Sequence, residues 1–275
     1  MLSNNTNNTT TIPIYKSTTN KCSIIQHTNN NVCDNVCGNV CDNKYSLQLL
    51  FSDELFLRSI GNSNILNVTT INNTFTSIYF YASSIKSLES YLNELTNKLK
   101  ITNNEGDNDE EDVYDDEEEK EPYILYDQSI QIISCLTKQQ LFLENNGHGF
   151  FNITLNDIIV IDDHLFIYIN PTFIKPFSTE SYGQFHFYSP FIRNKYSSPE
   201  LLAIDKLPAS VSYKTFYYSL GALITSSCLF SGINNGINTN IDWLLILQPI
   251  IHTKLYWFLV RCLSNNYESR HLCLI

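Results

Sequence analysis

A run of acidic residues limits how this chain can fold. Residues 105–121, EGDNDEEDVYDDEEEKE, contain twelve acids and one lysine. Carboxylates at this density repel one another and bury almost no apolar surface, so the run predicts a solvated, disordered insert outside any core. With bounds of 101–122, this insert separates residues 12–100 from residues 123–275, and an Asn/Thr-rich segment, residues 1–11, is also predicted to be disordered.

The acidic run also accounts for the net charge of the chain. The formal net charge is −11, and the residues outside the run hold sixteen acids and sixteen bases. This neutral body offers no basic face, which argues against nucleic acid as a partner. The apolar stretches are too short or too interrupted to span a membrane, and the polar first residues do not resemble a secretion signal. The eight cysteines are therefore expected to be reduced, in the cytoplasm or the nucleus.

Three of the cysteines recur at equal spacing. Cys33, Cys37 and Cys41 lie in NVCDNVCGNVCDN, and Cys22 would be available as a fourth thiolate. Structural zinc sites use closely spaced cysteine pairs separated by a longer loop, which is a different pattern. A low-complexity loop at residues 31–43 is therefore favoured over a metal site.

The apolar periodicity changes from strand-like to helix-like along the chain. Before the insert, the pattern predicts hairpins at residues 12–28 and 65–83 and helices at residues 52–60 and 87–99. After it, the pattern predicts a helix at residues 126–146, a hairpin at residues 157–169, an irregular stretch at residues 172–197, and helices to the end. A small β-rich part followed by a larger helical part predicts an α+β fold.

The hairpin at residues 157–169 carries polar residues at its two ends. Two apolar runs, DIIVID and LFIYI, flank an Asp-Asp-His turn. Asn152, Thr154 and Asp157 lie at the entrance of the hairpin, and Asn170 lies at its exit. These four residues form the candidate site.

In this order the elements resemble the eukaryotic protein kinase fold, with a small, truncated β-rich N-lobe and a larger, mainly helical C-lobe. In that family a His-Arg-Asp-x₄-Asn loop opens a hairpin that ends at Asp-Phe-Gly. The stretch FFNITLND resembles this loop, which sets Phe150, Phe151 and Asn152 against His-Arg-Asp and Asp157 against the metal-binding asparagine. Asn170 follows at the family's usual interval, so Asn-Pro-Thr stands at the Asp-Phe-Gly position.

Later segments carry the resemblance to the end of the chain. SSPELL resembles the Ala-Pro-Glu motif, with Pro199 and Glu200. KTFYYSLGALI resembles the Asp-x-Tyr/Trp-Ser-Leu-Gly helix, with Phe216 at the usual aspartate and Gly221 at the glycine. LVRCLSNNYESR resembles the family's late Leu-x-x-Cys-Leu-x-x-Asp-Pro-x-x-Arg segment, with Arg270 at its end. The resemblance implies that Glu200 and Arg270 form a buried, structural ion pair.

The substitutions at the catalytic positions argue against phosphoryl transfer, which depends on positioning and charge. CSIIQ resembles the strand that carries the ATP-binding lysine, and it places Gln26 there without a positive charge. The amide of Asn152 cannot act as a carboxylate base, and the carbonyl of Asn170 is a weaker ligand for a hard cation than a carboxylate. The resemblance therefore implies a pseudokinase with weak or absent ATP and Mg²⁺ binding, acting as a scaffold or allosteric partner of another protein.

Several alternatives stay open. A divergent serine/threonine kinase would have to use a relocated lysine such as Lys16 or Lys21, and a third hypothesis is a nucleotide sensor without turnover. Asp157 either binds a metal or only caps the hairpin. The aromatic residues of 181–196 form either a partner site or part of the core.

Overall fold

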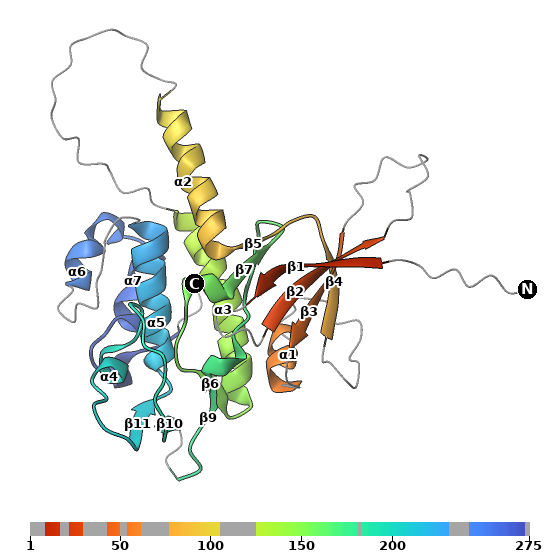
Figure 1. The fold of residues 1–275 in the computed structure, drawn as a ribbon. Coiled ribbons are helices and arrows are strands. Elements are labelled where there is room, and N and C mark those ends of the chain that lie inside the picture. The colour runs from red at the N-terminus through yellow and green to blue at the C-terminus, as the bar shows by residue number, and fades with distance from the viewer. Residues whose placement is uncertain are drawn as a thin grey trace, which may run out of the picture.

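The chain has an α+β fold in which a four-stranded antiparallel sheet lies to one side of a larger part that contains helices and smaller antiparallel sheets (Figure 1). The computed structural model describes residues 9–16, 22–29, 43–49, 54–61, 77–104, 125–180, 183–230 and 242–272. No helix in these ranges is long and apolar enough to cross a membrane.

A four-stranded antiparallel sheet lies at the N-terminal end of the described chain. Its strands are β1 (Thr9–Lys16), β2 (Cys22–Asn29), β3 (Asn43–Leu49) and β4 (Ser77–Ala82), paired in that order. The predicted hairpin at residues 12–28 is confirmed as β1 and β2. Because β1 begins at Thr9, the strand pairing includes three residues of the segment predicted to be disordered.

The second predicted hairpin differs from the structure. Its second half is β4, but β4 pairs with β3, a strand that the sequence analysis missed. Its first half, residues 65–72, lies outside the described residues. The cysteine repeat and Lys21 also lie outside them.

The three long helices predicted from periodicity are present. They are α1 (Glu54–Gly61), α2 (Leu88–Asn104) and α3 (Tyr126–Asn145). Helix α2 extends to Asn104, past the predicted start of the acidic insert, and residues 105–124 lie outside the described chain. Helix α1 packs against α3, which connects the four-stranded sheet to the helical part of the molecule.

The central hairpin is confirmed as β7 (Ile158–Ile161) and β8 (Leu165–Tyr168). Strand β5 (Ile85–Ser87) adds to β7 and makes a three-stranded sheet. The turn between β7 and β8 contains Asp162 and Asp163, both with positive φ. Asp162 Oδ1 accepts hydrogen bonds from the backbone N–H groups of Ser83 (2.7 Å) and Ser84 (2.8 Å), which fixes the turn against the segment between β4 and β5.

Short elements surround this hairpin. Strand β6 (His148–Phe150) pairs with β9 (Ile174–Pro176), and β10 (Gln184–Phe187) pairs with β11 (Ala209–Ser212). The helices that follow are α4 (Pro199–Leu202), α5 (Thr215–Leu223), α6 (Trp243–Ile246) and α7 (Lys254–Cys262). A π-helical stretch, Ile224–Leu229, continues α5. The sequence analysis predicted only helices after residue 197, so strand β11 differs from that prediction.

Helix α5 forms the centre of the helical part, because every one of its nine residues is buried. A helix that is apolar on all sides must be surrounded by other elements. Gly221 allows α7 to approach closely: a Cβ at this position would lie 3.0 Å from Cys262 Cβ.

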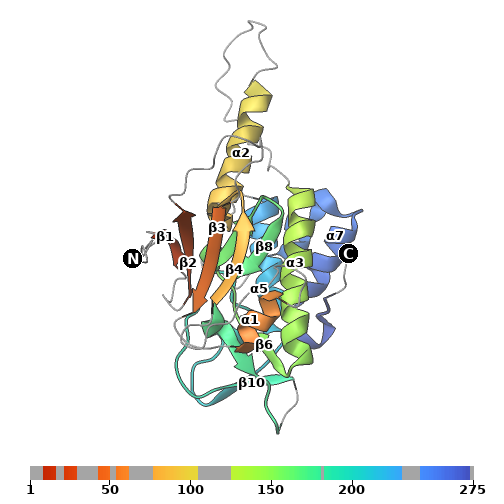
Figure 2. The ribbon, with the colours of Figure 1, turned by 90° about the vertical axis from the view of Figure 1, so that its right-hand side faces the viewer.

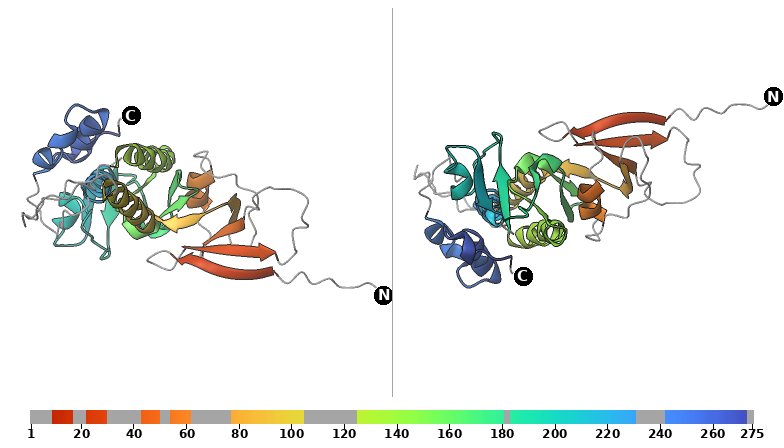
Figure 3. Two further views of the ribbon diagram at one scale, coloured as in Figure 1. Left: turned by 90° about the horizontal axis from the view of Figure 1, so that it is seen from above. Right: turned by 90° about the horizontal axis from the view of Figure 1, so that it is seen from below.

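The views of the molecule agree on the order of its layers. The sheet of β1–β4 and helix α7 lie at opposite sides, with the hairpin and α3 between them (Figure 3). The C-terminal end of α2 and strand β10 lie at opposite ends along the other direction (Figure 2).

Candidate functional site

The residues at the two ends of the β7–β8 hairpin meet inside the protein. Asp157 ends a 3₁₀ turn (Leu155–Asp157) before β7, and Asn170 precedes another 3₁₀ turn (Pro171–Phe173) after β8. Because the strands are antiparallel, the entrance and the exit of the hairpin lie side by side. The backbone N–H of Ile169 donates to the carbonyl oxygen of Asp157 at 2.8 Å, and the side chains of Asp157 and Asn170 are fully buried.

The Asp157 carboxylate accepts hydrogen bonds from both sides of the hairpin end. Asn170 Nδ2 donates to Asp157 Oδ2 at 2.6 Å, and Thr154 Oγ1 donates to the same oxygen. The Asn170 side-chain oxygen in turn accepts from the backbone N–H of Thr172 at 3.1 Å. A buried carboxylate needs such donors to be tolerated in a fold. Across the described ranges, no three His, Cys, Asp or Glu residues form a group that could hold a metal ion.

Asn152 is also fully buried, and its amide connects the hairpin entrance to the segment before α4. Its Nδ2 donates to the carbonyl oxygen of Ile192 at 3.0 Å, and its Oδ1 accepts from the backbone N–H of Ile153 at 2.9 Å. Ser197 Oγ lies 3.5 Å from the same Oδ1. Asn194 Nδ2 donates to the carbonyl oxygen of Ile153 at 2.8 Å, so a second amide ties the two segments together.

Gln26 lies in the four-stranded sheet and not in this buried cluster. Its backbone is paired between Ile12 of β1 and Tyr45 of β3. The sequence analysis grouped it with Asn152, Asp157 and Asn170 as degenerate catalytic positions. The structure brings Asp157 and Asn170 into contact, places Asn152 against the segment before α4, and places Gln26 in strand β2.

The aromatic residues before Asn152 are part of the core. The ring of Phe150 lies 5.5 Å from that of Phe216 on α5 and 4.8 Å from that of Tyr168 on β8. The ring of Phe151 makes edge contacts with Phe173 at 5.2 Å and Phe187 at 5.1 Å. The resemblance would put a histidine at residue 150 and an aspartate at residue 216. The structure has two phenylalanines in contact at these positions.

The aromatic stretch at residues 181–196 divides between core and surface. Phe185, Phe187 and Tyr196 are buried, as the packing alternative predicts. Tyr188 and Ile192 remain exposed, by 77% and 54% of their surface. For the exposed residues, the alternative of a partner site stays a prediction.

Glu200 and Arg270 form an ion pair in which two guanidinium nitrogens contact the two carboxylate oxygens. Arg270 is fully buried, and its Nε donates to the carbonyl oxygen of Ser264 at 2.7 Å. Its guanidinium also lies over the ring of Tyr218, 5.1 Å from the centroid. Pro199, next to Glu200, is the first residue of α4, a position that proline favours. The pair joins α4 to the C-terminal end of the described chain.

Two buried glutamines on α3 position the hairpin, and the sequence analysis missed both. Gln139 Nε2 donates to the carbonyl oxygen of Tyr168 at 2.9 Å, and its Oε1 accepts from the N–H of Tyr168 at 3.1 Å. Gln140 Oε1 accepts from the N–H of Phe150 at 2.9 Å. The only signal in the sequence is that the two glutamines interrupt an apolar helix.

A partly buried carboxylate, that of Glu144, lies on the same helix. Burial raises the pKa of Glu144, although hydrogen bonds from Gln140 and Tyr217 act in the opposite direction. Tyr217 donates its hydroxyl to the two carboxylate oxygens at 2.9 and 3.0 Å. Burial, with the nearby Glu144 charge, raises the pKa of Tyr217 far above its usual range, so this hydroxyl stays protonated.

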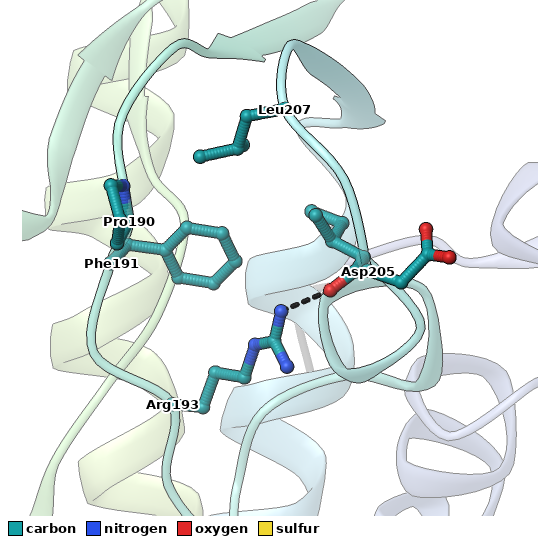
Figure 4. A pocket seen from close by; sticks show the side chains of 6 residues that line it. Pro190, Phe191, Arg193, Asp205 and Leu207 are labelled. Atoms are coloured by element: carbon teal, nitrogen blue, oxygen red, sulfur yellow. Dashed lines mark hydrogen bonds between the residues drawn. The ribbon is translucent and has the colours of Figure 1, made fainter.

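The surface near the site is hollowed between the segment before α4 and the loop after it (Figure 4). This hollow has a volume of about 390 Å³ and is lined by Pro190, Phe191, Arg193, Ile204, Asp205 and Leu207. It offers apolar side chains at the surface, among them Leu207, which is 37% exposed.

No model of a protein family matches this chain, and no curated protein matches it.

Proposed function

We propose that this chain is a protein kinase-like protein without phosphotransfer activity, which acts as a scaffold or allosteric partner of another protein. The observation that carries the proposal is the burial and hydrogen bonding of two amide side chains at the ends of the hairpin. Asn152 and Asn170 are fully buried, and their side chains are engaged in hydrogen bonds within the protein.

The chemistry of these contacts supports an inactive site. A catalytic base must accept a proton from a substrate within hydrogen-bond distance, and an amide at residue 152 has no basic oxygen for this step. A Mg²⁺ site of the kinase type needs carboxylate ligands, but Asn170 is an amide and donates a hydrogen bond to the carboxylate of Asp157. The hydrogen bond between Asn170 and Asp157 instead holds the two ends of the hairpin together.

Two further observations agree with a kinase-like scaffold. The resemblance implies a structural ion pair between Glu200 and Arg270, and these two residues are in contact. The order of elements also fits two lobes, with β1–β4 and α1 as the smaller one and the helices from α3 onward as the larger one. In this proposal the segment of Ser83 and Ser84, held by Asp162, would be the connection between the lobes.

The test is a phosphotransfer assay combined with thermal melting. We expect no incorporation of labelled phosphate into generic substrates or into the protein, and less than about 1 °C of stabilisation by ATP with Mg²⁺ or Mn²⁺. The variants are Lys16→Met and Asp157→Ala, with Lys138→Met, on the exposed side of α3, as control. Incorporation that is lost in the first two variants and kept in the control would establish a divergent kinase.

A further inference from the structure

The hollow between Phe191 and Leu207 is built from apolar walls. Figure 4 shows the side chains of these two residues facing the hollow from opposite sides, with Pro190 beside Phe191. Leu207 keeps 37% of its surface exposed. Such a pocket fits one apolar side chain of a bound polypeptide.

Of the two charged side chains that line this pocket, Arg193 and Asp205, the guanidinium is the one turned toward the hollow (Figure 4). The Arg193 guanidinium lies 5.5 Å from the ring of Phe191 and donates to the carbonyl oxygen of Ile204, which orients it beside the hollow. Lys206 stands in the sequence between the lining residues Asp205 and Leu207, and Lys195 follows Arg193 by two residues. Both lysine side chains are exposed. Among the described residues, the ion pairs found involve none of these three cations. Asp205 also lines the pocket, but its carboxylate points away from Phe191 and Arg193 (Figure 4).

An apolar pocket with a basic edge favours an acidic segment that carries a few apolar side chains. This chain contains such a segment, because Val113 and Tyr114 stand between EED and DDEEE within residues 105–121. The remaining residues of that run are acids, one lysine, one asparagine and one glycine. The pocket and the segment are therefore complementary in both charge and apolar character.

The position of α2 argues that one chain supplies the pocket and another supplies the segment. The acidic run follows Asn104, the last residue of α2, and the described chain resumes at Leu125. Helix α2 ends at the opposite end of the molecule from α4 and β10, near which the pocket lies (Figures 1 and 2). Within one chain the run would have to extend along the whole molecule and return.

We propose that the pocket binds the acidic segment of a second copy of this chain, with Val113 or Tyr114 between Phe191 and Leu207 and the acids against Arg193, Lys195 and Lys206. The contact is head-to-tail, so a pair of bound chains still presents one free pocket and one free segment. Such contacts generate rings or open chains of copies. This inference is independent of whether the protein transfers phosphate, and either proposal can fail without the other.

The test uses two complementary variants in sedimentation velocity experiments. Arg193→Glu keeps the acidic segment and reverses the charge at the pocket, whereas a deletion of residues 105–121 keeps the pocket and removes the segment. We expect the full chain to self-associate with rising concentration, each variant alone to stay monomeric, and an equimolar mixture of the two to form a dimer and nothing larger. Raising NaCl from about 50 mM to about 500 mM should dissociate all of these species.

Two further variants separate the pocket from general charge effects. Lys206→Glu, on an exposed side chain, should weaken self-association at least about tenfold, and Lys138→Glu, which changes the net charge equally on α3, should leave it unchanged. A synthetic peptide of residues 106–119 should bind the deletion variant, and its Val113→Ser/Tyr114→Ser form should not.

Three outcomes would overturn the proposal. One is a full chain that stays monomeric at every concentration, even if the peptide binds the deletion variant, because that result places the segment in its own pocket or nowhere. Another is self-association that survives both Arg193→Glu and Lys206→Glu. The last is an absence of dimer in the mixture of the two complementary variants.

Discussion

At residue 170, replacing one nitrogen with oxygen would turn a hydrogen bond into a repulsion. Asn170→Asp places a second carboxyl group 2.6 Å from Asp157 Oδ2 in a fully buried position. Two carboxylates at this distance cannot both ionise without a large cost. We expect urea unfolding at pH 7 to show a loss of roughly 2–4 kcal/mol, and a smaller loss at about pH 5, where the two groups can share a proton.

The same variant reports on metal binding. If the only obstacle to a cation is the amide of Asn170, then Mg²⁺ or Mn²⁺ should restore the stability of Asn170→Asp and leave the original protein unchanged. Asn266→Asp is the control, because Asn266 is exposed and caps a 3₁₀ turn by accepting from the N–H of Glu268, which a carboxylate does equally well. A stability of Asn170→Asp equal to that of the control would contradict the close contact with Asp157.

The Glu200–Arg270 pair predicts unequal effects for its two members. Arg270→Ala removes a fully buried side chain that also contacts Ser264 and Tyr218, and Glu200→Ala leaves that guanidinium buried without its carboxylate. Each should cost roughly 3–5 kcal/mol in chemical unfolding, with Arg270→Ala the larger. The double variant should recover part of the summed loss, and two near-neutral single variants would mean that the pair is unimportant for the fold.

At the scale of the elements, α3 and α5 are coupled through Glu144 and Tyr217. The folded protein holds the Glu144 proton more tightly than the unfolded chain does, because burial raises the pKa of this carboxyl above its ordinary value of 4.5. Its contribution to stability is therefore complete below about pH 4.5 and is lost as the pH rises through the folded pKa. Glu144→Gln keeps the hydrogen-bonding oxygen and removes this loss.

Unfolding midpoints across the pH range from about 4 to about 8 check this linkage. The difference in stability between Glu144→Gln and the original protein should be small at the acid end and should grow in favour of the variant toward neutral pH. Tyr217→Phe removes a donor that stabilises the Glu144 charge, so it should make the decline with pH steeper. A difference between Glu144→Gln and the original protein that is constant with pH would contradict the raised pKa.

The approach of α7 to α5 decides the effect of a substitution at Gly221. Alanine favours a helix by about 1 kcal/mol over glycine, so Gly221→Ala would be stabilising on an exposed helix. Here the added Cβ would lie 3.0 Å from Cys262 Cβ and 3.1 Å from Leu263 Cγ, and overpacking costs roughly 1–3 kcal/mol. We expect net destabilisation, measured as a lower melting temperature.

The partner variant for this prediction is Leu263→Ala, which removes one of the two side chains in the way. In that background Gly221→Ala should cost less than in the original protein, because the contacts with Leu263 are removed and only the 3.0 Å contact with Cys262 Cβ remains. If Gly221→Ala raises the melting temperature of the original protein, the two helices lie further apart than described.

The elements that the sequence predicts are those whose pattern is local. Helices α1, α2 and α3 and the β7–β8 hairpin show their periodicity over adjacent residues. The pairs β6–β9 and β10–β11 were missed, since these strands are three or four residues long and pair with partners far along the chain.

The same distinction applies to the site. Asn152, Asp157 and Asn170 are identifiable because they flank apolar runs, whereas Gln139 has the sequence appearance of any helical glutamine. Only the packing of α3 against the hairpin shows that its amide satisfies both backbone groups of Tyr168. Burial of a polar side chain depends on tertiary contacts, and no window of local sequence contains them.

At the scale of the whole molecule, the acidic run carries the net charge but lies outside the described fold. Deleting residues 105–121 removes twelve acids and one lysine, and with them the whole formal charge of −11. Since these residues can bury almost no apolar surface, the melting temperature of the dilute monomer should change by less than about 2 °C. A larger drop would show that the run packs against the body.

Limited proteolysis gives a second view of the same segment. Cleavage near Asp112 should be rapid, and the two halves should remain associated through the contact of α1 with α3. Strong protection in a dilute sample, where copies do not associate, would contradict an unpacked segment.

The pair of rings formed by Phe150 and Phe216 also has a consequence for how this sequence can change over generations. An ionisable side chain introduced at either position alone would be buried against an aromatic ring with no partner of opposite charge, at a cost comparable to the stability of a domain. A polar pair would have to arrive at both positions together, with neighbours to accept it. Substitution by single steps therefore keeps this part of the core apolar, because each single change to a charged residue would carry that cost alone.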